Sequence, residues 1–200
     1  MAVVFEGGLG LLAMALGWWL GPRPLESIGW TFSAAACGAA ASLPMMVVFG
    51  ACLRVPIRPF LEIVRVVDEL LVPMFRHCRV WQLALIAALA GLGEEMLFRG
   101  VIQEATAGWI GGPLGIWVGL AVAGVLFGLL HPFTPAYALL AGLMGLYLGW
   151  LWLATGNLLV PISAHAVYDF LALVYLVNIR GRKAGVGDRQ ESVDVPEWLP

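Results

Sequence analysis

The sequence has little charge. Only 12% of its 200 residues are Asp, Glu, Lys or Arg, whereas 61% are hydrophobic and the mean hydropathy is +0.90. Soluble domains carry about 25% charged residues, so this composition excludes a soluble globular protein. The formal net charge of −2 is spread too thinly to indicate a nucleic-acid partner. The partner that the composition predicts is the lipid bilayer.

The sequence also lacks the motifs of several enzyme classes. Its three cysteines, Cys37, Cys52 and Cys78, are widely spaced and form no C-x-x-C pair, so neither a disulfide framework nor a cysteine zinc knuckle is indicated. There is no G-x-S-x-G, no H-E-x-x-H and no Cys paired with His. The absence of G-x-S-x-G and of a Cys–His pair argues against a serine or cysteine nucleophile. No internal repeat is visible, which weakens a transporter built from paired halves.

Long apolar runs are abundant. A transmembrane helix needs about 20 predominantly apolar residues, and six stretches of this kind are present. They are Val3–Leu20, Ile28–Leu53, Val80–Phe98, Pro113–His131, Pro135–Gly156 and Leu158–Asn178. The expected fold is all-α, a polytopic transmembrane bundle of about six spans. We expect one transmembrane domain over residues 1–180, and a solvated tail of disordered composition at 181–200.

The segment Pro56–His77 has a different pattern. Apolar residues recur at helical spacing between charged ones, which predicts an amphipathic helix on the membrane surface. Basic residues gather in and beside this segment and again after the sixth stretch, so the positive-inside rule places both regions, and hence both termini, in the cytoplasm. No basic residue precedes the first stretch, so we expect no signal peptide and a bacterial plasma-membrane protein.

Ionisable residues inside the apolar stretches are few and costly. A charge at mid-bilayer costs about 2.5–3.5 kcal/mol, so such residues are usually paired and functional. Three clusters occur, in the third, fourth and sixth stretches. They are Glu94-Glu95-x-x-x-Arg99, Phe127-x-x-x-His131 and His165-x-x-x-Asp169. Other acidic residues, such as Glu6, Glu26 and Glu104, lie near span ends and need no function.

Helical spacing assigns these residues to faces. Glu95 and Arg99 are four apart and can form an ion pair, whereas Glu94 lies about 100° around the helix and is the better candidate for a free carboxylate. His165 and Asp169 are also four apart, so the carboxylate can hold one imidazole nitrogen. Each cluster taken alone also fits a structural role, such as a helix-end salt bridge. All three being inert together is a weaker interpretation.

In order, residue type and spacing, the three clusters resemble the CPBP (Abi-like) family of membrane proteases, which includes the type II CAAX prenyl endopeptidases. The resemblance covers about residues 80–178. It implies an intramembrane endopeptidase that hydrolyses a peptide bond of a membrane-associated peptide or protein. Prenylated C-terminal peptides are the substrates of the best-known relatives, but nothing in the sequence identifies a prenyl groove.

The resemblance also implies a role for each matching residue. Glu94 would be the general base that takes a proton from water, and His131 would orient that water. His165 would stabilise the oxyanion or protonate the leaving amine. Glu95 and Arg99 would hold the helix that presents Glu94. Phe127, one turn before His131, would form part of the cavity wall.

Asp169 departs from relatives that have Asn at this position. An amide can donate to an oxyanion, but an ionised carboxylate can only accept. Asp169 must therefore orient His165, stay protonated or bind a metal. Two His with Glu94 and Asp169 could bind zinc through nitrogen and oxygen ligands, yet Glu and His could also activate water unaided, so zinc and no metal both remain open.

Two other function classes remain open. A proton or metal-ion transporter would also place Glu, His and Asp inside a bundle. A non-catalytic scaffold or immunity-type protein would keep the fold without the activity. The sequence also leaves a conflict of depth, because Glu94 lies towards the outer end of its span and His131 towards the inner end of the next. A third helix that continues past Arg99 towards Ala107 would bring them closer.

Overall fold

The computed structural model describes residues 2–180, and the expected tail at 181–200 lies outside this range. Every regular element within it is helical, which confirms the all-α prediction. The elements are α1 (Ala2–Leu20), α2 (Phe32–Ala41), α3 (Leu43–Arg54), α4 (Arg58–Val66), η1 (Val67–Leu71), α5 (Val72–Phe75), α6 (Val80–Leu97), η2 (Phe98–Gln103), α7 (Glu104–Ile110), α8 (Gly112–Leu129), α9 (Pro135–Thr155), α10 (Leu159–Val174) and η3 (Tyr175–Arg180). The three η segments are single π-helical stretches that continue neighbouring α-helices.

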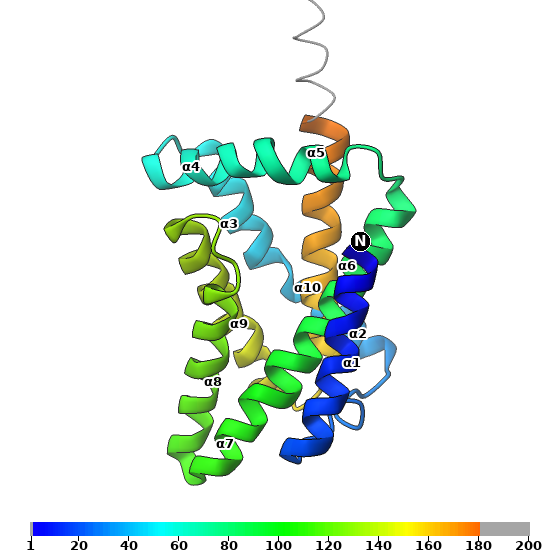
Figure 1. Cartoon of the computed structure of the whole chain (residues 1–200), viewed down its shortest axis with the longest axis vertical. Helices are drawn as coiled ribbons and strands as arrows, with labels where there is room; N and C mark the ends of the chain where they lie inside the picture. The colour runs from blue at the N-terminus through cyan, green and yellow to red at the C-terminus, as the bar shows by residue number, and fades with distance from the viewer. Residues whose placement is uncertain (1, 181–200) are drawn as a thin grey trace, which may run out of the picture.

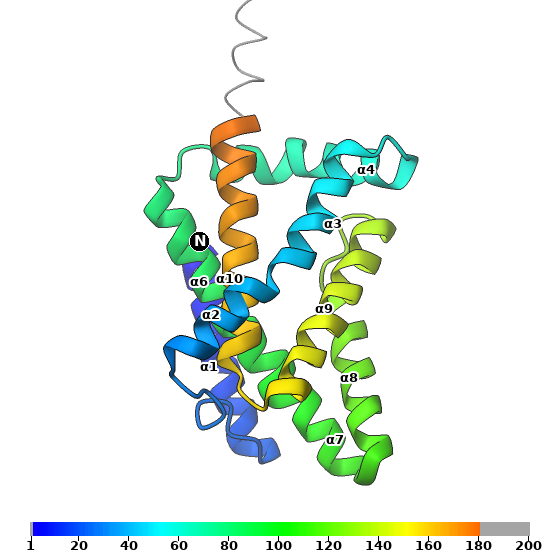
Figure 2. The same cartoon turned by 180° about the vertical axis from the view of Figure 1, so that it is seen from behind.

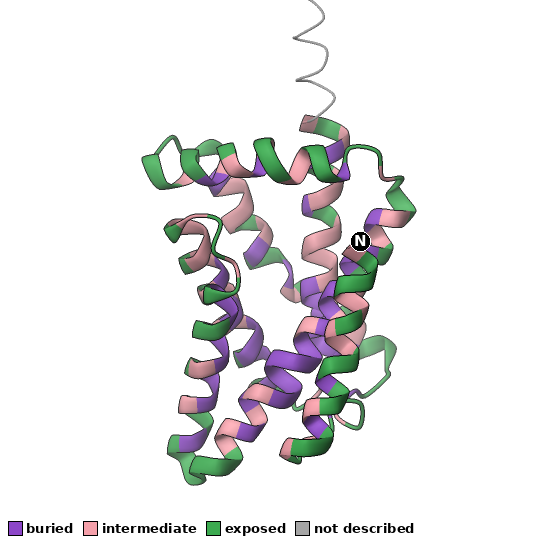
Figure 3. Ribbon diagram, in the orientation of Figure 1, coloured by how far each residue is buried: buried purple, intermediate pink, exposed green. Residues whose placement is uncertain are grey.

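Five helices of the described chain are long and apolar enough to cross a membrane. They are Ala2–Leu20, Phe32–Arg54, Gly112–Leu129, Pro135–Thr155 and Leu159–Arg180. Their outward faces carry exposed large apolar side chains, such as Trp18 at 89% and Phe32 at 91% exposure, while buried residues gather inside the bundle (Figure 3). An apolar exterior around a packed interior is what a lipid environment favours. The chain is therefore a helical membrane protein.

The second apolar stretch forms one of these candidate spans, Phe32–Arg54, but the helix is interrupted at Ser42 and divides into α2 and α3. The chain from Ile28 to Thr31 precedes the first helix, and Thr31 caps α2 by accepting a bond from the Ala34 amide at 3.2 Å. α2 then ends before Ser42, whose hydroxyl donates to the Ala39 carbonyl at 2.7 Å. Pro44, at the start of α3, has no amide hydrogen to continue the helical bonding of α2.

The third stretch forms a helix that is longer than its predicted span. α6 continues without a break through η2 into α7, so the helix runs from Val80 to Ile110 rather than ending at Phe98. Glu94 consequently lies near its middle, which removes the conflict of depth. Gly111 and Gly112 reverse the chain into α8 with φ of 73° and 61°, a conformation that residues with a Cβ rarely adopt. Figure 1 shows α7 and α8 meeting at this turn.

The expected amphipathic helix is formed by α4, η1 and α5, which cross one end of the bundle (Figures 1 and 2). Its apolar side is buried through Ile63 and Val67, which pack with Leu176 of η3. Asp68 of η1 accepts two hydrogen bonds from Arg180, both at 2.8 Å. This helix is thereby attached to the far end of the helix that carries His165.

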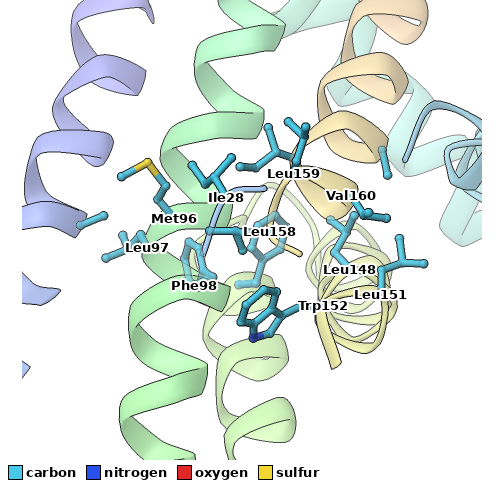
Figure 4. Close-up of a cluster of buried hydrophobic side chains, with 14 of the residues drawn as sticks. Ile28, Met96, Leu97, Phe98, Leu148, Leu151, Trp152, Leu158, Leu159 and Val160 are labelled. Carbon is cyan, nitrogen blue, oxygen red and sulfur yellow. The ribbon is translucent and has the colours of Figure 1, made fainter. Parts of the chain in front are cut away.

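The main apolar core lies in the other half of the bundle. Figure 4 shows its centre, where residues 96–98 of α6 and η2 meet residues 148–152 of α9 and 158–160 at the start of α10. Asn157 fixes the start of α10, since its side-chain oxygen accepts from the amides of Leu159 at 3.0 Å and Gly29 at 2.9 Å. The three helices with the predicted clusters are thus held around one core.

Candidate active site

A cavity of about 550 Å³ lies between the amphipathic helix and the three motif-bearing helices. Five of the predicted site residues line it, and their chain positions span three helices and the loop after α8. They are Glu94, Phe127, His131, His165 and Asp169. The other two, Glu95 and Arg99, do not reach the cavity and lie behind its wall. The structure therefore brings all three clusters together, as the sequence predicts.

Glu95 connects the first cluster, to which it belongs with Arg99, to the third cluster, which contains His165. Its Oε1 accepts a hydrogen bond from Arg99 Nη1 at 3.0 Å and lies 2.8 Å from His165 Nδ1. Glu95 and Arg99 have no exposed surface, and His165 is 5% exposed. A hydrogen bond between charged groups is strong in a buried environment of low dielectric, and an unpaired charge there is correspondingly costly. Glu95 thus fixes both the arginine of α6–η2 and the imidazole of α10.

Arg99 extends this network to α9. Its Nη2 donates to the Gly145 carbonyl at 2.7 Å, and its guanidinium carbon lies 4.6 Å from the centre of the Phe127 ring. A Cβ on residue 145 would lie 3.1 Å from Phe127 Cβ and 3.3 Å from Arg99 Nη2, so glycine allows this close approach. Arg99 therefore ties α6, α8 and α9 together behind the cavity.

His165 lies between two carboxylates. Nδ1 faces Glu95, and Nε2 lies 3.5 Å from Asp169 Oδ2. An imidazole with a proton on each nitrogen matches both partners. The Nε2 side faces the cavity, where Asp169 also lies. The geometry thus fits the option that Asp169 orients His165.

Glu94 points into the cavity rather than into the network. Its Oε2 is buried and has no hydrogen-bond partner among residues 2–180. This matches the expectation, from its place about 100° around the helix from Glu95, that it is the free carboxylate. A carboxylate oxygen without a protein partner can accept a hydrogen bond from a water molecule in the cavity.

His131 lies in the turn after α8. Its Nδ1 lies 2.7 Å from the Phe127 carbonyl, and because a carbonyl only accepts, Nδ1 carries the hydrogen. The ring stacks on Phe127 with 4.7 Å between centres. Burial lowers the pKa of His131, although its bond to the Phe127 carbonyl acts in the opposite sense. In the neutral ring Nε2 is an acceptor, which suits a group that orients water.

The same geometry does not fit a zinc site. Both ring nitrogens of His165 already face carboxylates, and Nδ1 of His131 is occupied by a backbone carbonyl. In the described part of the chain, no three His, Cys, Asp or Glu groups converge in a way that would hold a metal ion. No step of the chemistry below is therefore assigned to a metal.

The cavity wall also contains Glu6, Tyr137 and Tyr168, which were not among the predicted site residues. Glu6, which we expected to need no function, has a buried Oε2 with no partner among the described residues. Gly10 and Gly93 let α1 approach α6 here, since the Glu6 carbonyl would lie 2.6 Å from a Cβ on residue 93. The sequence signal that could have indicated Glu6 is its position four residues before Gly10, which places both residues on the same face of α1.

One of the comparisons with known proteins found a match. Residues 76–171 match the family model described as type II CAAX prenyl endopeptidase Rce1-like. The match contains every predicted site residue and leaves out α1 to α5. No curated protein and no solved structure matches the chain. The model that matches thus describes the same family of membrane proteases that the three clusters resemble, over just under half of the chain.

Proposed function

We propose that this protein is an endopeptidase that hydrolyses a peptide bond of a membrane-associated substrate with water activated by Glu94 and His131. The observation that carries the proposal is the unpartnered, buried Glu94 oxygen in a cavity shared with both site histidines. The family match over residues 76–171 supports the reaction class. The apolar lining from α3, α4 and α5 is compatible with a lipid-modified peptide, of which a prenylated C-terminal peptide is the type we propose.

The reaction follows from the roles of these side chains. A water molecule donates one hydrogen bond to Glu94 and the other to Nε2 of His131, so that its lone pair is directed at the substrate carbonyl. The water oxygen bonds to the carbonyl carbon, one proton passes to Glu94, and the carbonyl electrons move onto oxygen. His165 donates from Nε2 to this oxyanion, while Glu95 keeps the ring in place through Nδ1.

Collapse of the intermediate completes the reaction. The carbon–nitrogen bond breaks, and the leaving nitrogen takes the proton that Glu94 holds. Glu95 and Arg99 touch no reacting atom in this scheme and act as positioning residues, because they fix His165 and the helix behind Glu94. The net reaction consumes one water molecule and gives one carboxylic acid and one amine.

The decisive experiment compares the parent chain with Glu94→Gln in detergent or liposomes. The substrates are matched C-terminal peptides with and without a prenyl group, and cleavage is followed by mass spectrometry. Loss of a general base predicts a fall of at least about 10²-fold in rate, with an unchanged melting temperature. Glu62→Gln, on the exposed side of α4, is the matched control and should cleave like the parent.

The possible results test the role of Glu94, the need for a prenyl group and peptidase activity separately. Equal cleavage by Glu94→Gln and the parent would contradict the role of Glu94. If only prenylated peptides are cleaved, the prenyl group is part of recognition, whereas equal rates would limit the proposal to a membrane endopeptidase. A folded parent chain that cleaves none of the peptides would favour a non-catalytic protein of the same fold.

A further inference from the structure

The site described so far is poor in hydrogen-bond donors. Peptide hydrolysis needs donors aimed at the oxygen that becomes negatively charged, and such sites commonly use two. Asp169 and Glu94 accept when ionised, and so does Glu6. His131 donates its Nδ1 hydrogen to the Phe127 carbonyl, so its Nε2 carries a lone pair and can only accept. His165 Nε2 is then the one nitrogen donor that the two histidines present to the cavity.

Two tyrosines bring further hydrogen-bond donors to the cavity wall. Tyr137 and Tyr168 both line the cavity, and neither phenol forms a hydrogen bond to any residue in the 2–180 range. Tyr147, by contrast, lies outside the cavity and donates its O–H to the Ala41 carbonyl at 2.8 Å. A partly buried phenol usually finds a partner, so two free O–H groups in one cavity indicate a ligand that accepts hydrogen bonds.

Tyr137 is the better placed of the two. It lies in the first turn of α9, where Thr134 accepts a bond from its amide at 3.0 Å, so its backbone position is fixed. Its ring centre lies 6.3 Å from that of His131 and 5.2 Å from that of Phe133. Tyr168, by contrast, packs edge-on against Phe49, with 6.4 Å between ring centres. Tyr137 therefore lies in the cavity wall beside His131, the histidine to which we assign the orientation of water.

We propose that the Tyr137 O–H is the second hydrogen-bond donor to the oxyanion, beside His165 Nε2. This inference rests on the proposed peptidase function. The phenol donates a hydrogen bond without giving up its proton, so the balance of the reaction above is unchanged. Tyr137 thus supplies the donor that an ionised Asp169 cannot, and it is a catalytic residue because it touches the reacting oxygen.

Tyr137→Phe tests the proposal cleanly, because it removes the O–H, keeps the ring and breaks no hydrogen bond with the described residues. Removing one oxyanion donor lowers kcat by about 10²–10³-fold, and we expect this with little change in KM. Tyr168→Phe should change kcat much less, and Tyr147→Phe, which loses a bond outside the cavity, should affect stability rather than kcat. Melting temperatures of all three variants are measured alongside.

A second variant separates catalysis from packing. Asp169→Asn places an amide N–H in the cavity, so Tyr137→Phe combined with Asp169→Asn should regain part of the lost kcat. A purely structural role of Tyr137 would not be rescued in this way. Parent-like kcat in Tyr137→Phe, or a loss confined to Tyr168→Phe, would overturn the inference and leave the peptidase proposal standing. No cleavage by the parent chain would overturn both.

Discussion

Glu95 and Arg99 form an ion pair, 3.0 Å between Oε1 and Nη1, at a place where neither side chain has any exposed surface. The same oxygen of Glu95 faces His165, and the other nitrogen of Arg99 binds the Gly145 carbonyl. Taking two charges out of a polar environment is costly, and a pair recovers that cost only with good geometry. The pair is therefore better understood as fixing the relative positions of α6, α9 and α10 than as a simple source of stability.

Arg99→Met should strongly destabilise the fold. It leaves the Glu95 carboxylate buried without its main partner, which costs about 3–5 kcal/mol in comparable pairs. The free energy of unfolding in mild detergent measures this. Arg23→Met removes an exposed ion pair and should cost less than about 1 kcal/mol. Adding Glu95→Gln to Arg99→Met should recover part of the loss; a double variant less stable than the single one would contradict this account.

Asp169→Asn should retain cleavage. The amide oxygen can still accept from His165 Nε2 across the present 3.5 Å, and the amide hydrogens add donors to the cavity. We expect a rate within about tenfold of the parent, since the imidazole keeps a partner. Asp169→Ala removes the partner and should be slower than Asp169→Asn. Initial rates on one peptide decide the order, and an inactive Asp169→Asn would show that the charge itself is needed.

Chelators should leave cleavage unchanged. The ring nitrogens of His165 and Nδ1 of His131 already have partners, and no set of three ligating groups converges in the described part of the chain. The protein is incubated for a long period with a strong chelator, and the chelator with any bound metal is then removed. The rate of peptide cleavage and the metal content are measured on the same sample. Lost activity that returns on adding Zn²⁺ would contradict this prediction and would require rearranged histidines.

Asp68→Asn should loosen the amphipathic helix over the cavity. Asp68 holds Arg180 through two bonds of 2.8 Å, and both side chains are partly exposed, so the pair contributes up to about 1 kcal/mol. Cys52 lines the cavity beneath this helix, whereas Cys37 is exposed on α2. Labelling of Cys52 by a polar thiol reagent should rise by up to about fivefold, relative to Cys37. An unchanged ratio of Cys52 to Cys37 labelling would contradict the prediction that the amphipathic helix loosens.

The apolar stretches predicted the helices well because hydropathy acts over about 20 residues, and single side chains matter little at that scale. The break at Ser42 was missed because it depends on one hydroxyl bond and one proline within an otherwise apolar run. The continuation of α6 to Ile110 was foreseen only as a way to bring Glu94 and His131 together. Local pattern gave no reason to extend a span through Arg99 and Gln103.

The site was predictable where it depended on spacing along one helix. The Glu95–Arg99 pair and the free Glu94 follow from positions four apart and one apart. The bond between Glu95 and His165 joins residues 70 positions apart, and helix spacing carries no information about such a contact. Tyr137 was missed for the same reason, because only the packing of α9 against the cavity brings its phenol beside His131.

The cavity lining has a consequence for sidedness. None of its residues comes from η2, α7 or the first part of α8, whereas the amphipathic helix, the start of α1 and Arg180 all contribute. If the proposed function holds, we expect water and substrate to reach Glu94 from the end of the bundle next to the amphipathic helix, because the apolar core of Figure 4 fills the other half. In oriented vesicles, an inhibitor that cannot cross the bilayer should act from one compartment alone, and both cleavage products should leave into that same compartment.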